Sequence, residues 1–447
     1  MAISPARATA FHILSRVERE DAFASELLHS PKYANLSPAD QALVTELVMG
    51  VLRWQSLLDS RIGQSSSLKI GKIDIEVLIA LRIAAYQLLF LERIPPSAAI
   101  NESVELVKCA RKRSAAPFAN AVLRKIDKEP RNTQAIRDAI CHAETVEDLA
   151  SSSAHPRWLV ERWARTFGLD VARRICLSNQ SVPQTTIRLR KQEAETELKN
   201  AGVEVTPGTL LASARRIAAG DVTETATFRE GLIVIQDEAS QLVAMLTGKG
   251  SRLLDCCAAP GGKTSILADR NQQSLVVGAE LHPHRARLLR RLVPQKNVAV
   301  IAADANNLPF SGEFEGVLAD VPCSGTGTLA RNPEIKWRIK PDDLKDLQAR
   351  QVGILASAMS QVAPGGTLVY STCSLEHEEN NAVVEKALAA NPTFRLQDCR
   401  TALLNLRKEG ELVIDNIDAL VEDTFLRTLP GVLPVDGFFA AILIREK

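Results

Sequence analysis

The sequence predicts an all-α domain, a small α/β connecting region and a carboxy-terminal α/β domain with a doubly wound, mostly parallel sheet. Apolar residues recur at helical spacing through residues 5–128, with no strand pattern among them. From residue 236 onward, short apolar runs alternate with helical segments, as in a doubly wound sheet. At 447 residues the chain is too long for one ordinary core. We place the domains at residues 1–135, 136–235 and 236–447.

Proline and glycine breaks divide the all-α part into about six helices. The breaks fall at residues 37–38, 63–67, 95–96 and 116–117. Ser37 is the predicted N-cap of one helix, because Pro38 follows at the first helical position. Basic runs at residues 111–113 and 124–125 are as consistent with a solvated surface as with a binding face.

The residue pattern changes between residues 131 and 230, where mixed polar segments replace the regular helical pattern. A helical stretch containing Trp158 and Trp163 comes first, and these side chains are expected to pack one domain on the next. A strand at residues 185–189, a helix at 193–201 and a strand at 203–205 follow. This pattern predicts a short α/β piece.

Six apolar runs predict the strands of the carboxy-terminal sheet. They lie at residues 252–256, 275–279, 298–302, 316–319, 367–370 and 438–444. Ligands of such sheets bind outside the carboxyl ends of the strands. Residues that directly follow these runs are therefore the candidates for a functional site.

Composition limits the classes of function and environment. The chain has 54 Lys and Arg residues against 53 Asp and Glu, so its net charge does not attract a nucleic acid. Such a partner would have to bind local basic patches. The eight cysteines lack paired C-x-x-C spacing, which argues against a zinc site or a disulfide framework and favours a reducing cytoplasm. No apolar run approaches the ~20 residues that span a membrane, so we expect a soluble protein with no membrane partner.

Two cysteines follow predicted strands and suggest covalent chemistry. Cys323 lies in Asp-Val-Pro-Cys-Ser-Gly-Thr-Gly at residues 320–327, and Cys373 in Tyr-Ser-Thr-Cys-Ser at residues 370–374. A thiol held as thiolate at such a position can attack an electron-poor carbon. Both cysteines lie in turns rich in small residues, which disfavours the alternative of two inert core cysteines. These observations do not rank the two as nucleophiles.

A turn and three acidic residues predict an adenosine ligand. The small-residue turn at residues 256–262 joins the first strand to a helix and lets the backbone approach a ligand closely. Its spacing is neither that of a dinucleotide fingerprint nor that of a P-loop. Glu280, Asp304 and Asp320 follow the next three strands, where Glu280 can accept both ribose hydroxyls. S-adenosylmethionine is the natural choice, because its sulfonium makes the methyl group electrophilic without a metal.

These residues resemble the NOP/Sun (Fmu) family of RNA cytosine-5 methyltransferases, and within it the bacterial ribosomal-RNA enzymes. The motifs lie at residues 257–263, 320–327, 332–337, 364–374 and 436–439. The helical half resembles the NusB-type domain fused to these enzymes, through residues 45–53, 94–102 and 118–126. The chain departs from the family pattern at Glu280, where Asp is usual, and at Val321, where Ala is common.

The resemblance implies a Rossmann-like class I methyltransferase that methylates C5 of a cytosine in 16S rRNA through a covalent bond from Cys373 to C6. Cys323 then assists loss of the C5 proton and release of the enzyme. Asp320 hydrogen-bonds the N3/N4 edge of the base, and Lys263 orients Asp320 or the base. No metal is implied. S-adenosylmethionine is expected at Cys257, Ala258, Ala259, Pro260, Gly261, Gly262, Lys263, Glu280, Asp304 and Asp320.

The same resemblance implies how the protein binds its RNA substrate. C6 is hidden in a stack, so the target base is single-stranded or flipped out. The NusB-like half adds contact with small-subunit ribosomal RNA, and the protein is expected to be a monomer. Residues Arg331, Lys336, Arg338 and Lys340 are candidates for guiding the phosphate chain, with a plain charged surface as the alternative.

His282 and His284 are expected at the surface, and Cys256 is expected to pack in the core.

Three alternatives remain open at this point. In a DNA cytosine-5 methyltransferase, Cys323 itself would attack, and Cys373 would have no purpose. An RNA-binding antitermination or ribosome-assembly factor could carry a vestigial methyltransferase half, although an intact acid trio and both thiols argue against decay. A methyltransferase of another RNA would use the same residues.

Overall fold

The computed structural model describes residues 3–33, 35–129, 131, 133–310 and 313–447 of the chain. The chain forms two compact units. The helical unit comprises Met1–Val182 together with Leu329–Arg338, and the sheet unit comprises Pro183–Thr328 and Ile339–Lys447. The connecting region predicted at residues 136–235 is therefore divided between the two units. Within the described ranges, no helix has the length and apolar character needed to cross a membrane.

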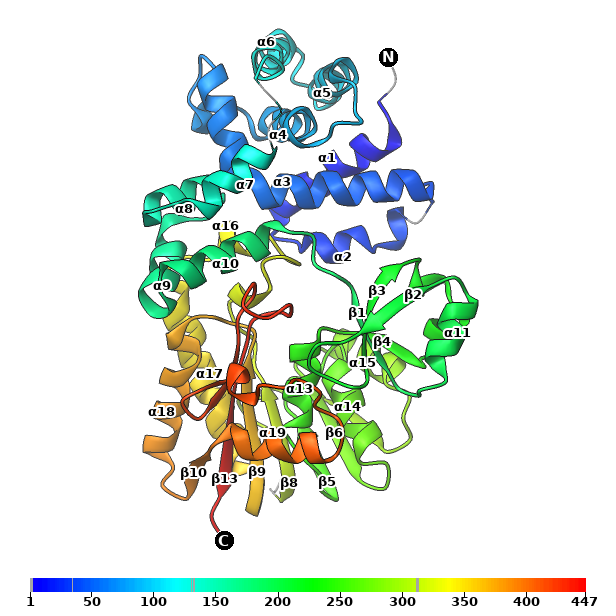
Figure 1. Ribbon diagram of the computed structural model, residues 1–447, viewed down its shortest axis with the longest axis vertical. Helices are drawn as coiled ribbons and strands as arrows, with labels where there is room; N and C mark the ends of the chain where they lie inside the picture. Colours follow the sequence, from blue (N-terminus) through cyan, green and yellow to red (C-terminus); the bar gives the residue numbers. More distant parts are fainter. Residues whose placement is uncertain (1–2, 34, 130, 132, 311–312) are drawn as a thin grey trace. The chain divides into compact units, whose positions relative to one another are not determined.

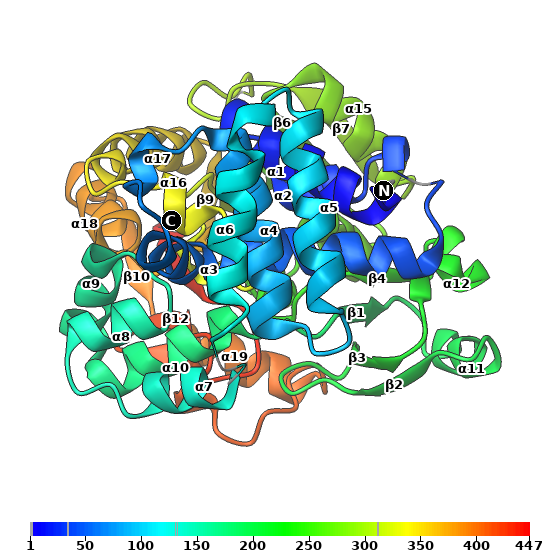
Figure 2. The same ribbon diagram turned by 90° about the horizontal axis from the view of Figure 1, so that it is seen from above.

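The helical unit begins with six α-helices, in agreement with the predicted number of about six, although the break between the first two was not predicted. They are α1 (Pro5–Glu20), α2 (Ala24–Leu28), α3 (Pro38–Ser65), α4 (Ile75–Phe90), α5 (Pro96–Cys109) and α6 (Ala116–Ile126). Figures 1 and 2 show α4, α5 and α6 side by side. Helix α4 is buried along almost its whole length, from Val77 to Leu89, because its sequence is apolar all round.

Local signals set the ends of α3. Ser37 caps it as predicted, since its Oγ accepts a hydrogen bond from the Asp40 backbone N–H at 3.1 Å. The helix continues through Gly63 and ends at Ser65, slightly later than the predicted break begins. Four more helices complete the consecutive part of the unit: α7 (Thr133–Cys141), α8 (Val146–Ser152), α9 (Arg157–Phe167) and α10 (Leu169–Gln180).

A small antiparallel sheet begins the sheet unit. Its strands are β1 (Thr186–Leu189), β2 (Glu204–Pro207), β3 (Ala214–Ala219) and β4 (Ile233–Ile235), in the order β2-β3-β1-β4. Helices α11 (Ala194–Asn200) and α12 (Ala226–Arg229) accompany it. The sequence predicts β1, α11 and β2 but misses β3, which is rich in Ala and Arg, and β4, which has only three residues.

The large sheet has the predicted doubly wound form. Its order is β11-β12-β13-β9-β8-β5-β6-β7, with β10 also paired to β13. Strands β5 to β9 are parallel, and the pairs that involve β10 to β13 are antiparallel. The bounds are β5 (Arg252–Asp255), β6 (Leu275–Glu280), β7 (Val298–Ala302), β8 (Phe314–Asp320), β9 (Val362–Thr372), β10 (Phe394–Gln397), β11 (Val421–Glu422), β12 (Phe425–Thr428) and β13 (Phe438–Arg445).

Helices cover both faces of this sheet (Figure 1). One face packs on α13 (Glu238–Met245), α14 (Gly262–Arg270), α15 (Pro283–Leu292) and α19 (Cys399–Lys408). The other packs on α17 (Asp343–Ser360) and α18 (Asn381–Ala390). Adjacent residues alternate between the two cores: Leu253 belongs to the first and Leu254 to the second. Burial on both faces explains why the strands are continuous apolar runs.

The strand order places a topological switch point between β5 and β8. The chain runs from β5 outward to β6 and β7, and then returns to pair β8 with the opposite side of β5. A crevice forms where the chain reverses direction, outside the carboxyl ends of these strands. The predicted site residues follow those strand ends.

Candidate active site

The predicted acidic residues meet in one cavity at the switch point. Asp255 ends β5, Glu280 ends β6 and Asp320 ends β8, while Asp304 follows β7. A cavity of about 200 Å³ is lined by Glu280, Asp304 and Asp320, together with Cys257, Ala259 and Pro322. The structure thus brings together three carboxylates that are 24 and 16 positions apart in sequence.

The turn after β5 depends on glycine. Gly261 has φ +119°, and a Cβ there would lie 2.4 Å from Val293 Cγ2 and 2.8 Å from Leu289 Cδ1. A second cavity, of about 660 Å³, is lined by all seven residues from Cys257 to Lys263. The backbone of the turn therefore faces open space on one side and packs closely on α15 on the other.

Asp255 is a buried residue that hydrogen-bonds to the start of the helix after the turn. It is 1% exposed, and its Oδ2 accepts a hydrogen bond from Thr264 Oγ1 at 2.7 Å. Burial raises the pKa of Asp255 to about 6, against the opposing effect of the Thr264 hydrogen bond. The neighbouring Cys256 is buried in the core, and its burial holds the pKa of the thiol well above its ordinary value.

Glu280 and Asp304 are held by short local hydrogen bonds. Glu280 is 6% exposed, and its Oε1 accepts from the His282 backbone N–H at 3.1 Å. Asp304 is exposed, and its Oδ1 accepts from the Asn306 N–H at 2.9 Å. That backbone bond and the Asn306 side chain lower the pKa of Asp304. His282 and His284 are both exposed, as predicted.

The two predicted reactive cysteines lie in contact. Cys323 follows β8 and Cys373 follows β9, and their sulfur atoms are 3.2 Å apart. Strands β8 and β9 are parallel neighbours, so both loops leave the sheet at the same edge. The hydrogen bond with Cys373, followed by burial, holds the pKa of Cys323 well above its ordinary value.

Lys263 joins the turn to Asp320. Its Nζ lies 2.8 Å from Asp320 Oδ2 and 5.1 Å from the centre of the Phe438 ring. Burial by itself would lower the pKa of Lys263, but the charge of Asp320 and its hydrogen bond outweigh burial and raise the pKa. Sequence reasoning did not single out Ser371, whose Oγ donates to Asp320 Oδ1 at 2.8 Å. Its place two residues before Cys373 was the available signal.

The prediction that Lys336 guides phosphates, or lies on a plain charged surface, is wrong. Lys336 lies in α16 (Ile335–Arg338) and is 1% exposed within the helical unit. Its Nζ donates to the Arg53 carbonyl at 2.8 Å. Arg338 likewise donates to backbone carbonyls, including that of Val17 at 2.8 Å. Both side chains hold the segment Leu329–Arg338 in place, whereas Lys340 is exposed and belongs to the sheet unit.

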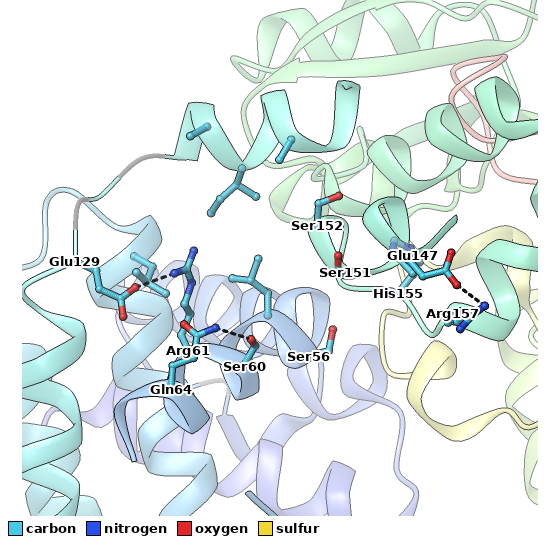
Figure 3. Close-up of a pocket in the computed structure, with 16 residues that line it drawn as sticks. Ser56, Ser60, Arg61, Gln64, Glu129, Glu147, Ser151, Ser152, His155 and Arg157 are labelled. Carbon is cyan, nitrogen blue, oxygen red and sulfur yellow. Dashed lines mark hydrogen bonds and ion pairs between the residues drawn. The ribbon is translucent and has the colours of Figure 1, made fainter. Parts of the chain in front are cut away.

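A further cavity, of about 770 Å³, lies within the helical unit and is lined by none of the predicted site residues (Figure 3). Its polar lining includes an ion pair between Arg61 and Glu129 at 3.2 Å and another between Arg157 and Glu147. Apolar side chains such as Leu57 fill much of the remaining wall.

Three family models match successive parts of the chain. Residues 4–128 match the NusB family, and residues 155–223 match the ferredoxin-like domain of RsmF/B-like methyltransferases. Residues 243–444 match the 16S rRNA methyltransferase RsmB/F. The matches cover all three parts of the predicted architecture.

Similar proteins extend over almost the whole chain. A protein of Bacillus subtilis named probable ribosomal RNA small subunit methyltransferase B is 34% identical, over 99% of this chain and 98% of its own length. The ribosomal RNA small subunit methyltransferase B of Vibrio cholerae is 31% identical, over 92% of this chain and 91% of its own. Among solved structures, PH0851 matches with a TM-score of 0.79 and 25% identity, covering 100% of both chains.

Proposed function

The chain belongs to the 16S rRNA methyltransferase RsmB/F family, and we propose that it transfers a methyl group from S-adenosylmethionine to C5 of a cytosine in 16S rRNA. One observation carries the proposal. The sulfur atoms of Cys323 and Cys373 lie 3.2 Å apart at the end of two parallel strands, beside a cavity lined by Glu280, Asp304 and Asp320. The site thus combines two thiols with a pocket suited to adenosine.

The residues around the two cavities fit S-adenosylmethionine. Where Gly278 faces the turn, a Cβ would lie 3.2 Å from that of Ala258, so only small residues leave this close packing undisturbed. The N-terminal end of α14 and the turn from Cys257 to Lys263 would hold the cosubstrate, with Glu280 at the ribose and Asp304 at the adenine amino group. When bound, S-adenosylmethionine supplies an electrophilic methyl group and needs no metal.

Cys373 is the nucleophile in this mechanism. Its thiolate adds to C6 of the cytosine, which raises the electron density at C5, the atom that takes the methyl group. The C5 proton then leaves, the C6–sulfur bond breaks, and the ring is restored. Cys323 is placed to take part in these later steps, because its sulfur lies 3.2 Å from that of Cys373. Cys323 assists release, as base or through its effect on elimination.

Asp320 and Lys263 position the base. The Asp320 carboxylate is held on one side by Lys263 and on the other by Ser371, which leaves it little freedom to rotate. In our proposal it hydrogen-bonds the N3/N4 edge of the cytosine and offsets the charge that develops during attack. Lys263 acts mainly through Asp320, as a positioning residue.

The helical domain, which we place at residues 1–135, supplies affinity for small-subunit rRNA. Its match to the NusB family and the exposed Arg111 and Arg113 support this role. Because C6 must be reached by a thiol, the target cytosine is unstacked when it enters the site. We further propose that the protein acts as a monomer in the cytoplasm, where thiols stay reduced.

Separate alanine variants of the two cysteines test the mechanism. Cys373→Ala should abolish the covalent protein–RNA adduct and lower methylation by at least about 10³-fold, since the attacking group is lost. Cys323→Ala should let the adduct accumulate, because attack remains and release is slowed. Denaturing gels of protein mixed with rRNA and S-adenosylmethionine would measure both. The reverse pattern would identify Cys323 as the nucleophile, as in DNA cytosine-5 methyltransferases.

A binding measurement separates catalysis from a purely RNA-binding role. Calorimetric titration of the folded wild-type protein with S-adenosylmethionine should show binding. Its absence would favour an RNA-binding assembly or antitermination factor. Bisulfite sequencing of rRNA from cells with and without the gene would identify the modified cytosine, or point to another RNA if rRNA is unchanged.

A further inference from the structure

A buried glutamate lies behind the two cysteine loops. Glu379 is in the 3-10 turn His377–Glu379, and its side chain is completely buried. Its carboxylate accepts four hydrogen bonds, all from neutral donors: the Ser324 N–H at 2.8 Å, Ser324 Oγ at 2.5 Å, Ser374 Oγ at 2.5 Å and Gln351 Nε2 at 2.9 Å. None of the proposed catalytic steps uses this group.

Three of the four donor groups belong to the two cysteine loops. Ser324 directly follows Cys323, and Ser374 directly follows Cys373. Oε2 of Glu379 accepts from both hydroxyls, and the two hydroxyl oxygens are themselves 3.0 Å apart. One oxygen atom thus joins the residues that follow the two sulfur atoms.

Further bonds strengthen this link. Gln351 donates to Glu379 and also to the Pro322 carbonyl at 3.0 Å, directly before Cys323. Asn380, the next residue after Glu379, accepts from Thr372 Oγ1 at 2.5 Å and donates to the Ser374 carbonyl at 2.9 Å. The residues on both sides of each cysteine are therefore tied to the Gln351, Glu379 and Asn380 side chains.

A carboxylate matches the centre of this arrangement. An ionised Glu is purely an acceptor with about four lone-pair directions, and four donors converge on it. A glutamine has the same shape, but its NH₂ replaces one acceptor oxygen, so two of the four donors lose their acceptor and the buried bonds must rearrange. The Glu379 charge also contributes, after Cys373 and burial, to raising the pKa of Cys323.

We propose that Glu379 is a positioning residue for methyl transfer, which holds the Cys323 and Cys373 sulfur atoms at a fixed separation by fastening Ser324 and Ser374 to one carboxylate. The proposal rests on the proposed function for its catalytic consequence, but the positioning itself is a property of the protein alone. A misplacement of about 1 Å at a reacting atom can lower a rate by about 10²-fold. Loss of the carboxylate should therefore affect the rate of catalysis rather than cosubstrate binding.

A probe of the two thiols tests positioning without any reaction on RNA. Phenylarsine oxide condenses with two nearby thiols, forming two As–S bonds and releasing water, and binds best when the thiols are held together. We expect the wild-type protein to bind it more tightly than Cys323→Ser, which defines the signal from this pair. Glu379→Gln should bind it at least about tenfold more weakly than wild type, because the pair is no longer held.

The matched control is Glu385→Gln, the same change on the exposed surface of α18. It should bind the arsenical like wild type. Unchanged arsenical affinity in Glu379→Gln would overturn the proposal, and so would a wild-type protein that binds no better than Cys323→Ser. If Glu379→Gln does not fold, Ser374→Ala removes one link while keeping the carboxylate, and the same weakening is expected in milder form.

Kinetics connect positioning with catalysis. Glu379→Gln should lower kcat for rRNA methylation by about 10²-fold and leave KM for S-adenosylmethionine within about twofold, because the cosubstrate turn is not touched. A rise in that KM with kcat unchanged would contradict the positioning role. If the wild-type protein methylates no RNA, the proposed function fails, while the arsenical measurement still decides the role of Glu379.

Discussion

Gly261 shows how one residue shapes the cosubstrate turn. Its φ of +119° is open to glycine, and the absent Cβ leaves Val293 and Leu289 free to pack against the turn. Gly248 also has a positive φ, of +79°, but a Cβ there would meet nothing within 4 Å. The two glycines therefore separate the effect of backbone strain from that of crowding.

We expect Gly261→Ala to destabilise the sheet unit by about 1–3 kcal/mol more than Gly248→Ala, because the added methyl group overpacks the contact with α15. Cosubstrate affinity should fall at least about tenfold in Gly261→Ala alone, since the turn must shift. Urea unfolding and calorimetric titration with S-adenosylmethionine would measure the two effects. Equal loss of stability in both variants would show that backbone strain, and not packing, makes glycine necessary.

At the scale of an element, the segment Leu329–Arg338 follows the Cys323 loop in sequence but belongs to the helical unit. Trp337 Nε1 donates to the Leu52 carbonyl at 2.7 Å, and the Glu334 carboxylate accepts from the Ala24 N–H at 2.8 Å. Lys336 is the most deeply buried cation of the segment, and burial holds its pKa well below the ordinary value. A buried amine with a lowered pKa makes stability depend on pH.

The direction of that dependence follows from proton linkage. Between the lowered folded pKa of Lys336 and the ordinary value near 10.5, the unfolded chain binds more protons than the folded one, so stability rises with pH. Relative to Lys336→Met, the wild-type helical unit should therefore gain stability as the pH rises from 7 toward about 9.5. Urea unfolding of the two proteins at several pH values would measure it.

Lys340→Met is the control, because Lys340 lies two residues beyond the segment and is exposed. Its free energy of unfolding should run parallel to that of wild type over the same pH range. A difference between wild type and Lys336→Met that does not change with pH would show that Lys336 is charged to the same degree in both states.

At the scale of the whole molecule, the question is which unit recognises RNA. Net charge is +1, so affinity must come from local groups of basic residues. Arg111 and Arg113 are exposed and lie between α5 and α6 of the helical unit. Truncation is a poor test, because Leu329–Arg338 would lose its partners in the helical unit. Charge reversal in the full chain avoids this problem.

Arg111→Glu combined with Arg113→Glu should weaken rRNA binding at least about tenfold and reduce the salt dependence of binding, because phosphate contacts are lost. Affinity for S-adenosylmethionine should stay unchanged. Lys296→Glu with Lys447→Glu changes the net charge equally and lies at the amino edge of the parallel strands, so it should leave rRNA affinity near the wild-type value. Equal weakening by both pairs would mean that general charge, and not the helical unit, governs binding.

The sequence by itself determined the elements and the candidate site residues that local patterns encode. Period-3.6 patterns predicted the all-α part, and continuous apolar runs predicted the parallel strands, because burial on one or both faces leaves that pattern in the sequence. Strand β3 was not predicted, because its Ala and Arg residues have no such pattern. Strand β4 was not predicted, because it is too short. Cys323, Cys373 and the acidic residues were identifiable because they follow strands.

Only the tertiary structure decided which of these residues meet and what holds them. Strand order brought the two sulfur atoms to 3.2 Å, and no local pattern encodes the pairing of β8 with β9. The tertiary structure also buries Lys336, which in the sequence is one more charge in a basic run. It places the Glu379 carboxylate between the two cysteine loops. Burial and contact between distant residues depend on the packing of the whole chain, and a local pattern of side chains does not specify them.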